Sequence, residues 1–446
     1  MIIDIVTAKK GGSGKTLVSL VKFDVAFREK LNIALVDMND MNPDSYLIST
    51  SILDFYEERG LIQRVPEEDL EKYTDYKPFF ILHAYRLINQ QSGHTQNILI
   101  IKPRYVIGED DPLKLNKFSS LDTFILLWKI TEFLSVSNLN IDYVVVDTNM
   151  SYEALIPWFL EDEEASNKYF SLFWTDYILD ADNRDILYQI LKAKTVEILK
   201  KKIILTIIFP LSMLIRKSAA MDEIDKISNA MEAIRRIKEK NGVGAANGPY
   251  INLVINAYIP IYRRISLGNY LRYLIRSVYR KLKRLSTQKI NMKECEGGNG
   301  IKDIECIRAI ISKGIKDRKI SNINDMLSAL RSNLISLFEM IERIERKIDI
   351  NNFFVAPIYS HDISDMIFRL RSGYKELKEL GLKVKKLSHE EGLIEPVWRK
   401  FLALIDIVKE ETIPPEMKHM LVKAHLVGGY SRKFRAMLQS LISERV

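Results

Sequence analysis

The feature that most constrains the fold is a glycine-rich turn directly after the first apolar segment. Residues 2–8, Ile-Ile-Asp-Ile-Val-Thr-Ala, are rich in β-branched side chains and predict a buried strand. The next residues are Lys9-Lys10-Gly11-Gly12-Ser13-Gly14-Lys15-Thr16, and an apolar helical pattern begins after them. Glycines in such a turn let successive main-chain N–H groups face one anion, and the helix start adds its positive dipole end. A strand, turn and helix in this order predict a phosphate-binding loop, against the plainer interpretation of a simple connection.

Two side chains of this turn have the chemistry that a nucleoside triphosphate requires. Lys15 is placed to neutralise the β- and γ-phosphates, and Thr16 can offer its hydroxyl to Mg²⁺. We therefore expect ATP and Mg²⁺ as cofactors.

The segment Lys10–Thr16 resembles the Lys-Gly-Gly-x-Gly-Lys-Thr loop of the deviant Walker A ATPases, which include ParA, MinD, the nitrogenase iron protein and the arsenic-pump ATPase. The resemblance implies a P-loop NTPase with a doubly wound, mainly parallel α/β sheet. It also implies an ATP-dependent homodimer in which Lys10 reaches the partner's phosphates, as an arginine finger does. The remaining loop residues that the resemblance assigns to the nucleotide are Gly11, Gly12, Ser13 and Gly14.

Two later apolar strands end in carboxylates. Asp37 ends the apolar segment that begins at Ile33, and the resemblance assigns it to the first switch and the Mg²⁺ shell. The resemblance identifies Asp147 as the Walker B acid that holds Mg²⁺. An Asp at a strand end also commonly caps the next helix, which is the plain alternative for Asp147. Where the family has a water-orienting Asp, this chain has Asn39, followed by Asp40. Because an amide cannot accept a proton, either Asp40 takes over this role or hydrolysis is slow.

Further strands continue the α/β pattern. We expect them at Asn97–Ile101, Tyr169–Trp174, Ile203–Phe209, Ile251–Asn256 and Phe353–Ile358, with a helix over Leu126–Leu134. The resemblance places Asn256 and Pro357 against the adenine base. An Asn at a strand end is also a common turn residue, so both interpretations of Asn256 stay open.

The domain prediction follows from these segments. The ATPase core is expected over residues 1–260 and 353–412, with residues 51–96 as an excursion of mixed character. Residues 261–352 are expected to form an inserted α-helical subdomain, and residues 413–446 a C-terminal helical tail.

The insertion begins with a basic amphipathic pattern. Residues 261–290 contain nine Lys or Arg and no Asp or Glu. The basic face consists of Arg272, Arg276, Arg280, Lys283 and Arg284. It has three interpretations: a solvated helix face, a contact for DNA phosphates, or a contact for an anionic membrane. In the tail, the stripe Phe434, Met437, Leu438, Leu441 and Ile442 predicts either a packed closing helix or a membrane-binding helix as in MinD.

The composition of the chain indicates its cellular compartment and excludes some classes of relatives. Lys and Arg number 66 against 58 Asp and Glu, so the basic excess matters mainly because it is clustered. The two cysteines are too few for a disulfide framework, and the first residues do not predict a secretory leader, so we expect a cytoplasmic protein. The absence of a Cys-x-x-Cys motif argues against protein-targeting relatives and the nitrogenase iron protein.

The function predicted from the sequence is a ParA-like, ATP-dependent dimerising ATPase that partitions or segregates DNA through non-specific DNA binding. Such a protein would act beside an adaptor or ATPase-stimulating protein. The alternatives are a MinD-like spatial regulator at a membrane surface or on a protein machine, and an ATP sensor with little turnover.

Overall fold

The computed structural model describes twelve parts of the chain, and all structural statements below concern them: residues 1–8, 13–39, 43–88, 95–104, 120–148, 189–190, 193–210, 217–244, 250–256, 352–356, 381–397 and 428–443.

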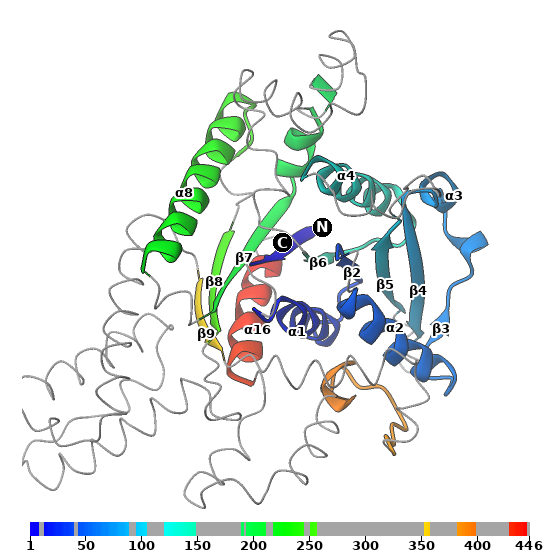
Figure 1. Ribbon diagram of the computed structural model, residues 1–446. Coiled ribbons are helices and arrows are strands. Elements are labelled where there is room, and N and C mark those ends of the chain that lie inside the picture. Colours follow the sequence, from blue (N-terminus) through cyan, green and yellow to red (C-terminus); the bar gives the residue numbers. More distant parts are fainter. Residues whose placement is uncertain are drawn as a thin grey trace, which may run out of the picture.

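The described strands form one nine-stranded sheet with the order β3-β4-β5-β2-β6-β1-β7-β8-β9 (Figure 1). All neighbours from β5 to β9 are parallel, whereas β4 pairs with both β3 and β5 in antiparallel fashion. The strands are β1 (Ile2–Thr7), β2 (Ile33–Asp37), β3 (Gln63–Arg64), β4 (Phe80–Ile88), β5 (Thr95–Pro103), β6 (Tyr143–Asp147), β7 (Lys202–Pro210), β8 (Tyr250–Asn256) and β9 (Asn352–Ala356). The expected α/β fold with a mainly parallel sheet is confirmed.

Helices cover both faces of this sheet (Figure 1). On one face lie α1 (Lys15–Arg28), α2 (Asp44–Glu57) and α16 (Gly428–Ser443), and on the other lie α4 (Ser120–Val136) and α8 (Lys217–Lys240). Two short helical turns, η1 (Glu67–Asp69) and α3 (Tyr73–Tyr76), lie between β3 and β4. Because β1, β2 and β6 are covered on both sides, every residue in them is buried, which explains their near-continuous apolar sequences.

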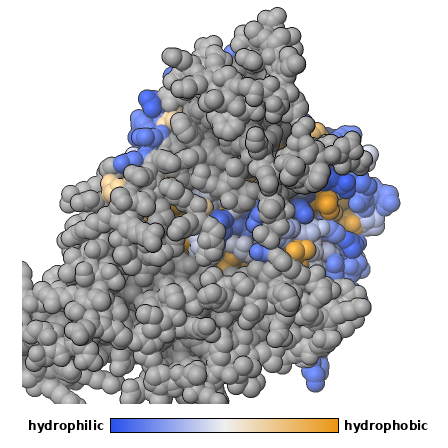
Figure 2. Space-filling view, in the orientation of Figure 1, coloured by the Kyte–Doolittle hydropathy of each residue, from blue (hydrophilic) through white to orange (hydrophobic). Residues whose placement is uncertain are grey.

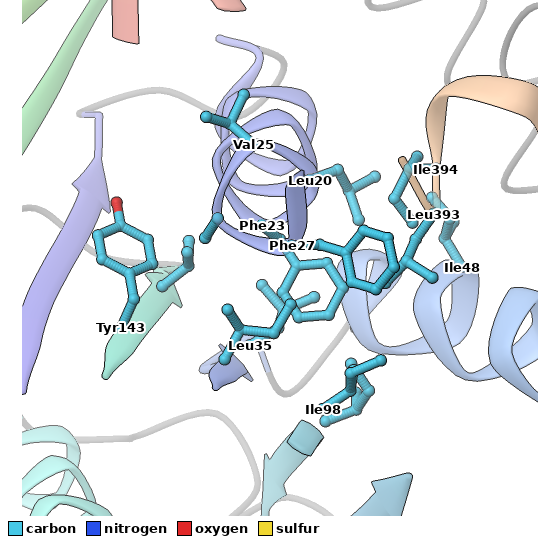
Figure 3. Close-up of a cluster of buried hydrophobic side chains, with 14 of the residues drawn as sticks. Leu20, Phe23, Val25, Phe27, Leu35, Ile48, Ile98, Tyr143, Leu393 and Ile394 are labelled. Atoms are coloured by element: carbon cyan, nitrogen blue, oxygen red, sulfur yellow. The ribbon is translucent and has the colours of Figure 1, made fainter. Parts of the chain in front are cut away.

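The core between the sheet and α1 is built from large apolar side chains. Figure 3 shows Phe23 and Phe27 of α1 beside Leu35 of β2 and Ile48 of α2, with Leu393 packed against the same cluster. The contact of residues 381–397 with α1 and α2 brings the late part of the chain onto the first two helices.

A buried ion pair fixes α1 to the middle of the sheet. Lys22 of α1 and Asp4 of β1 are both fully buried and in contact. Lys22 also donates to the hydroxyl of Thr206 (2.7 Å), and the Tyr143 hydroxyl donates to Asp4. The ring of Phe434 from α16 lies over the Lys22 ammonium, 4.3 Å from it. Five elements (α1, β1, β6, β7 and α16) therefore meet at one charged cluster inside the core.

Residues 51–96, for which the sequence predicted only an excursion of mixed character, contain regular secondary structure. These residues complete α2 and add β3 and β4, which extend the sheet in the antiparallel direction. The hydroxyl of Tyr73 accepts a hydrogen bond from the main-chain N–H of Leu82 and donates to the carbonyl of Phe80, so it covers part of the outer edge of β4. The visible surface near this edge is mainly hydrophilic (Figure 2).

The C-terminal stripe is packed in the structure. Phe434, Leu438 and Leu441 of α16 are buried in the core shared with α1, and Arg435 pairs with Glu29 at the end of α1. Two predictions lie outside the described residues, namely the strand at 169–174 and residues 261–351 of the expected insertion, whereas Asn352 begins β9. Within the described ranges, no helix combines the length and the apolar character that a membrane span requires.

Candidate functional site

The candidate site lies where β1, β2 and β6 end and where α1 and α2 begin. From β1 the chain proceeds to β2 and β5 on one side and to β7, β8 and β9 on the other, so the strand order reverses next to β1. In open α/β sheets, ligands bind at the carboxyl ends of the strands beside such a reversal. The predicted phosphate-binding turn starts at this point.

The start of α1 is suited to an anion. Gly14 precedes the helix with φ 97° and ψ 18°, a left-handed conformation that favours glycine. As the N-cap residue it provides no side-chain cap, and the first helical turn has no acidic residue. The helix start therefore keeps its positive end available for a bound anion.

Lys15 and Thr16 occupy the first turn of α1 and lie near Asp147. Burial lowers the pKa of Lys15, and the negative charge of Asp147 opposes this effect. The hydroxyl of Thr16 lies close to the carboxylate of Asp147 and acts to lower its pKa. A lysine, a hydroxyl and a carboxylate from three predicted positions thus come together at the end of β6.

Asp37 and Asp147 face each other across neighbouring strands, because β2 and β6 are parallel and these two residues are in register. Both side chains are almost completely buried. Burial, and then the charge of Asp147, raise the pKa of Asp37 to about 8. Burial raises the pKa of Asp147 to about 6, against the opposing effect of Lys15. Two buried carboxylates side by side favour a shared proton or a cation between them.

Asp37 also holds the beginning of α2. Pro43, the N-cap residue of this helix, makes no side-chain cap hydrogen bond. Instead Oδ2 of Asp37 accepts hydrogen bonds from the hydroxyl of Ser45 (2.8 Å) and the main-chain N–H of Tyr46 (2.9 Å). Its Oδ1 accepts one from the main-chain N–H of Asn39 (2.9 Å). The carboxylate therefore neutralises the positive end of α2 from the adjacent strand.

The structure brings together part of the predicted site. Ser13, Gly14, Lys15, Thr16, Asp37 and Asp147 lie around the ends of β1, β2 and β6. Asn39 directs its main-chain N–H toward Asp37. Asn256 ends β8, two strands from β1, at the same edge of the sheet. The predicted residues outside the described ranges are Lys10, Gly11, Gly12, Asp40, Pro357, Arg272, Arg276, Arg280, Lys283 and Arg284.

Sequence reasoning missed Ser45 and Tyr46. Ser45 is fully buried, and its hydroxyl donates to Asp37. A serine just inside the start of an apolar helical pattern was the available signal, because such residues often bond groups at a helix start.

The donor set fits magnesium bound together with phosphate. Within the described ranges, no group of three or more His, Cys, Asp or Glu side chains could hold a metal ion. Mg²⁺ does not need such a group, because it is usually held by one or two carboxylates, water and substrate phosphates. Asp147 and Thr16 supply a carboxylate and a hydroxyl beside the helix start where phosphates would lie. The residues present therefore fit a magnesium–triphosphate complex.

Comparison of the sequence with protein-family models finds no matching family, and comparison with curated proteins finds no matching protein. The function of this chain is therefore inferred from the sequence motif and the geometry of the site.

Proposed function

We propose that this chain is a P-loop ATPase that binds magnesium-ATP at the start of α1. The observation that supports this most directly is the placement of Lys15 and Thr16 beside the register-paired carboxylates Asp37 and Asp147. These groups come from three chain segments that the sequence motif had already singled out. A glycine-rich connection that binds no ligand would not explain why this lysine, this hydroxyl and these two carboxylates lie together.

Each of these residues has a separate role in binding magnesium-ATP. Lys15 and the free N–H groups of α1 offset the negative charge of the phosphates. Thr16 and Asp147 hold Mg²⁺, which when bound offsets charge that develops on the transferred phosphoryl group. Asp37 orders the start of α2 and carries the second carboxylate of the site.

Binding of ATP tests this proposal directly. The purified protein should bind a fluorescent ATP analogue in the presence of Mg²⁺, and Lys15→Ala should weaken binding at least about tenfold, because it removes a charge from the phosphates. Lys240→Ala at the exposed end of α8 is the control and should bind as the wild type does. Equal binding by both variants, or none by the wild type, would contradict the proposal.

The ParA-like role extends this proposal from the resemblance of Lys10–Thr16. ATP would join two copies through Lys10, the joined surface would bind DNA without sequence preference, and a partner would stimulate hydrolysis. Gel shifts with unrelated duplexes, with and without ATP across a salt series, test this role. Binding should require ATP and weaken steeply with salt, because phosphate contacts release counterions. An absence of binding at low salt would leave the MinD-like role, which liposome flotation tests.

A sensor with little turnover is the second candidate, and Asn39 is the observation that favours it. Its main-chain N–H is engaged with Asp37, and its amide side chain cannot accept a proton. If Asp40 is the catalytic acid, Asp40→Ala should abolish phosphate release and leave ATP binding intact. Equally low turnover in the wild type and this variant would favour the sensor.

A further inference from the structure

Ser45 occupies a position that neither the sequence motif nor the resemblance assigns. It lies in the first turn of α2 and is fully buried. Its hydroxyl donates to Oδ2 of Asp37 (2.8 Å), and Asp37 is in register with Asp147 on the neighbouring strand. The hydroxyl therefore orients one of the two carboxylates that face each other at the candidate site.

The chemistry of a hydroxyl suits this place. A serine hydroxyl has one donor and two acceptor lone pairs, so it can bond a carboxylate in either protonation state. An amide or a lysine in the same position would impose one pattern of donors or a permanent charge. Ser45 can therefore hold Asp37 in its place beside Asp147 whether or not a cation lies beside them.

The same residue connects Asp37, the last residue of β2, to the first turn of α2, which begins at Asp44. The Tyr46 main-chain N–H is bonded to the same Oδ2 as the Ser45 hydroxyl, so two consecutive residues of α2 hold Asp37. A change in the position of the Asp37 carboxylate would be transmitted to the start of α2.

The helix itself is held from its other side. The hydroxyl of Tyr46 is 2.7 Å from Nε2 of His83 on β4, and the Tyr85 hydroxyl donates to Asp54 in the last turns of α2 (2.6 Å). Because α2 is fixed along its length to the antiparallel part of the sheet, its first turn is a rigid support for the Ser45 hydroxyl.

We propose that Ser45 is a positioning residue, which holds Asp37 in its place beside Asp147 for Mg²⁺ and links the occupancy of the site to the start of α2. This inference deepens the proposed function and rests on it for its magnesium part. Its structural part, the link between Asp37 and the start of α2, does not depend on ATP binding.

The first experiment measures magnesium dependence. ATP-analogue binding is titrated with Mg²⁺ for the wild type, Ser45→Ala, Ser45→Thr and Ser49→Ala, and is repeated in EDTA. Ser49 is the matched control, because it is a buried serine of the same helix whose Oγ has no hydrogen-bond partner. Ser45→Ala should raise the Mg²⁺ concentration for half-saturation by about tenfold or more, as loss of outer-shell partners commonly does. Its affinity for ATP in EDTA should stay unchanged.

Ser45→Thr keeps a hydroxyl on the same carbon and should retain the wild-type magnesium dependence, and Ser49→Ala should as well. A folded Ser45→Ala protein with wild-type magnesium dependence would overturn the inference. A Ser45→Thr protein as weak as Ser45→Ala would also overturn it, because the hydroxyl would then not be the group that matters.

The second experiment separates this inference from the proposed function. Hydrogen exchange of the nucleotide-free protein should show faster exchange of the Tyr46 amide in Ser45→Ala than in Ser49→Ala, because the hydrogen bonds at Asp37 are weakened together. If the wild type binds no ATP but this difference is present, the proposed function fails and the positioning role stands. If the amide exchanges equally in both variants, the positioning role fails whatever the protein binds.

Discussion

At the scale of single residues, the molecule keeps two sets of charged groups inside the same layer of side chains. The pair Asp4 and Lys22 is fully buried in the middle of the sheet and has complementary charges. The pair Asp37 and Asp147 is buried at the carboxyl edge and has like charges. In the first arrangement each charge offsets the cost of burying the other, whereas in the second the two carboxylates repel each other and a bound cation would relieve this repulsion.

Single substitutions in the first pair should be costly. Lys22→Met leaves the Asp4 carboxylate buried without its cation, and we expect a loss of about 3–5 kcal/mol in the free energy of unfolding. Asp4→Asn should be costly as well, because Lys22 then has no counter-charge. In the double variant neither charge remains, and Asn can still accept the hydrogen bond from Tyr143.

Urea denaturation of the four proteins measures this coupling. The double variant should lose less stability than the sum of the two single losses, by about 2 kcal/mol or more. If the losses of unfolding free energy in the two single variants were additive, Asp4 and Lys22 would contribute independently to stability. That result would contradict the expectation from their direct contact.

The second pair should make stability depend on pH. Burial raises the pKa of Asp37 to about 8 and that of Asp147 to about 6, from 3.8. The folded chain therefore holds these protons more tightly than the unfolded chain does. Their contribution to stability is full below about pH 4 and is lost as the pH rises toward 8.

The measurement is urea denaturation in EDTA at pH 5 and pH 8. From pH 5 to pH 8 the free energy of unfolding of the wild type should fall by about 2 kcal/mol or more relative to that of Asp37→Asn. The reason is that the asparagine side chain of the variant carries no titrating proton, whereas Asp37 loses its proton over this pH range. Asp69→Asn, which changes an exposed carboxylate, is the control and should follow the wild type. Parallel behaviour of Asp37→Asn and the wild type would contradict the raised pKa.

At the scale of elements, the sequence predicted the parallel part of the sheet well. The strands β1, β2 and β6 are buried on both faces, so their apolar runs are continuous and their ends are marked by Thr or Asp. The antiparallel strand β4 was missed, because polar residues such as His83 and Arg86 interrupt it. The sequence between β4 and β5 also carries no strong hairpin signal.

The candidate site was predictable to the same extent. Lys15, Thr16, Asp37 and Asp147 follow from a motif and from strands that end in carboxylates. Ser45 did not follow, because its place at the site requires β2 to lie directly beside β6, so that Asp37, which its hydroxyl holds, faces Asp147. Strand order of this kind is a property of the whole sheet, and no local pattern in the sequence encodes it.

The segment 381–397 is a second element that only the structure explains. The carboxylate of Asp24 in α1 accepts hydrogen bonds from the main-chain N–H groups of Leu393 and Ile394, and the side chain of Arg28 donates to the carbonyl of Glu391. Gly392 lies against Asp24 with φ 82°. This close approach holds the segment on the helix that starts at the candidate site.

Gly392→Ala should therefore weaken the docking of this segment. A β-carbon on Gly392 would overlap a carboxylate oxygen of Asp24, and the positive φ adds backbone strain. Gly381→Ala is the matched control, since Gly381 has φ 64° but no atom within 4 Å of the position of a β-carbon. We expect a loss of about 1 kcal/mol for Gly381→Ala and about 3 kcal/mol or more for Gly392→Ala in urea denaturation. Equal losses of unfolding free energy in the two variants would show that the Asp24 side chain moves away from the added β-carbon without an energetic cost.

At the scale of the whole molecule, segments from the beginning and the end of the chain form one core. The helix α1 follows the first strand, yet it packs against residues 381–397 and against α16, which begins at Gly428. Contacts over such sequence separations predict that these parts unfold together. They also bear on the alternative in which α16 binds a membrane. Its release would expose Phe434, Leu438 and Leu441, and would uncover the buried ammonium of Lys22.

Substitutions in α16 test whether this helix belongs to the cooperative core. Phe434→Ala removes a fully buried ring that also lies over Lys22, so we expect it to cost about 3–5 kcal/mol of unfolding free energy. Arg435→Ala at the next position removes an exposed ion pair with Glu29 and should cost less than about 1 kcal/mol. The wild type should show coincident urea transitions by tryptophan fluorescence and far-UV circular dichroism. If Phe434→Ala left the main transition in place and only removed a separate, earlier one, α16 would be an independent element. Detachment of α16 would then cost little free energy, and this result would favour the alternative in which α16 binds a membrane.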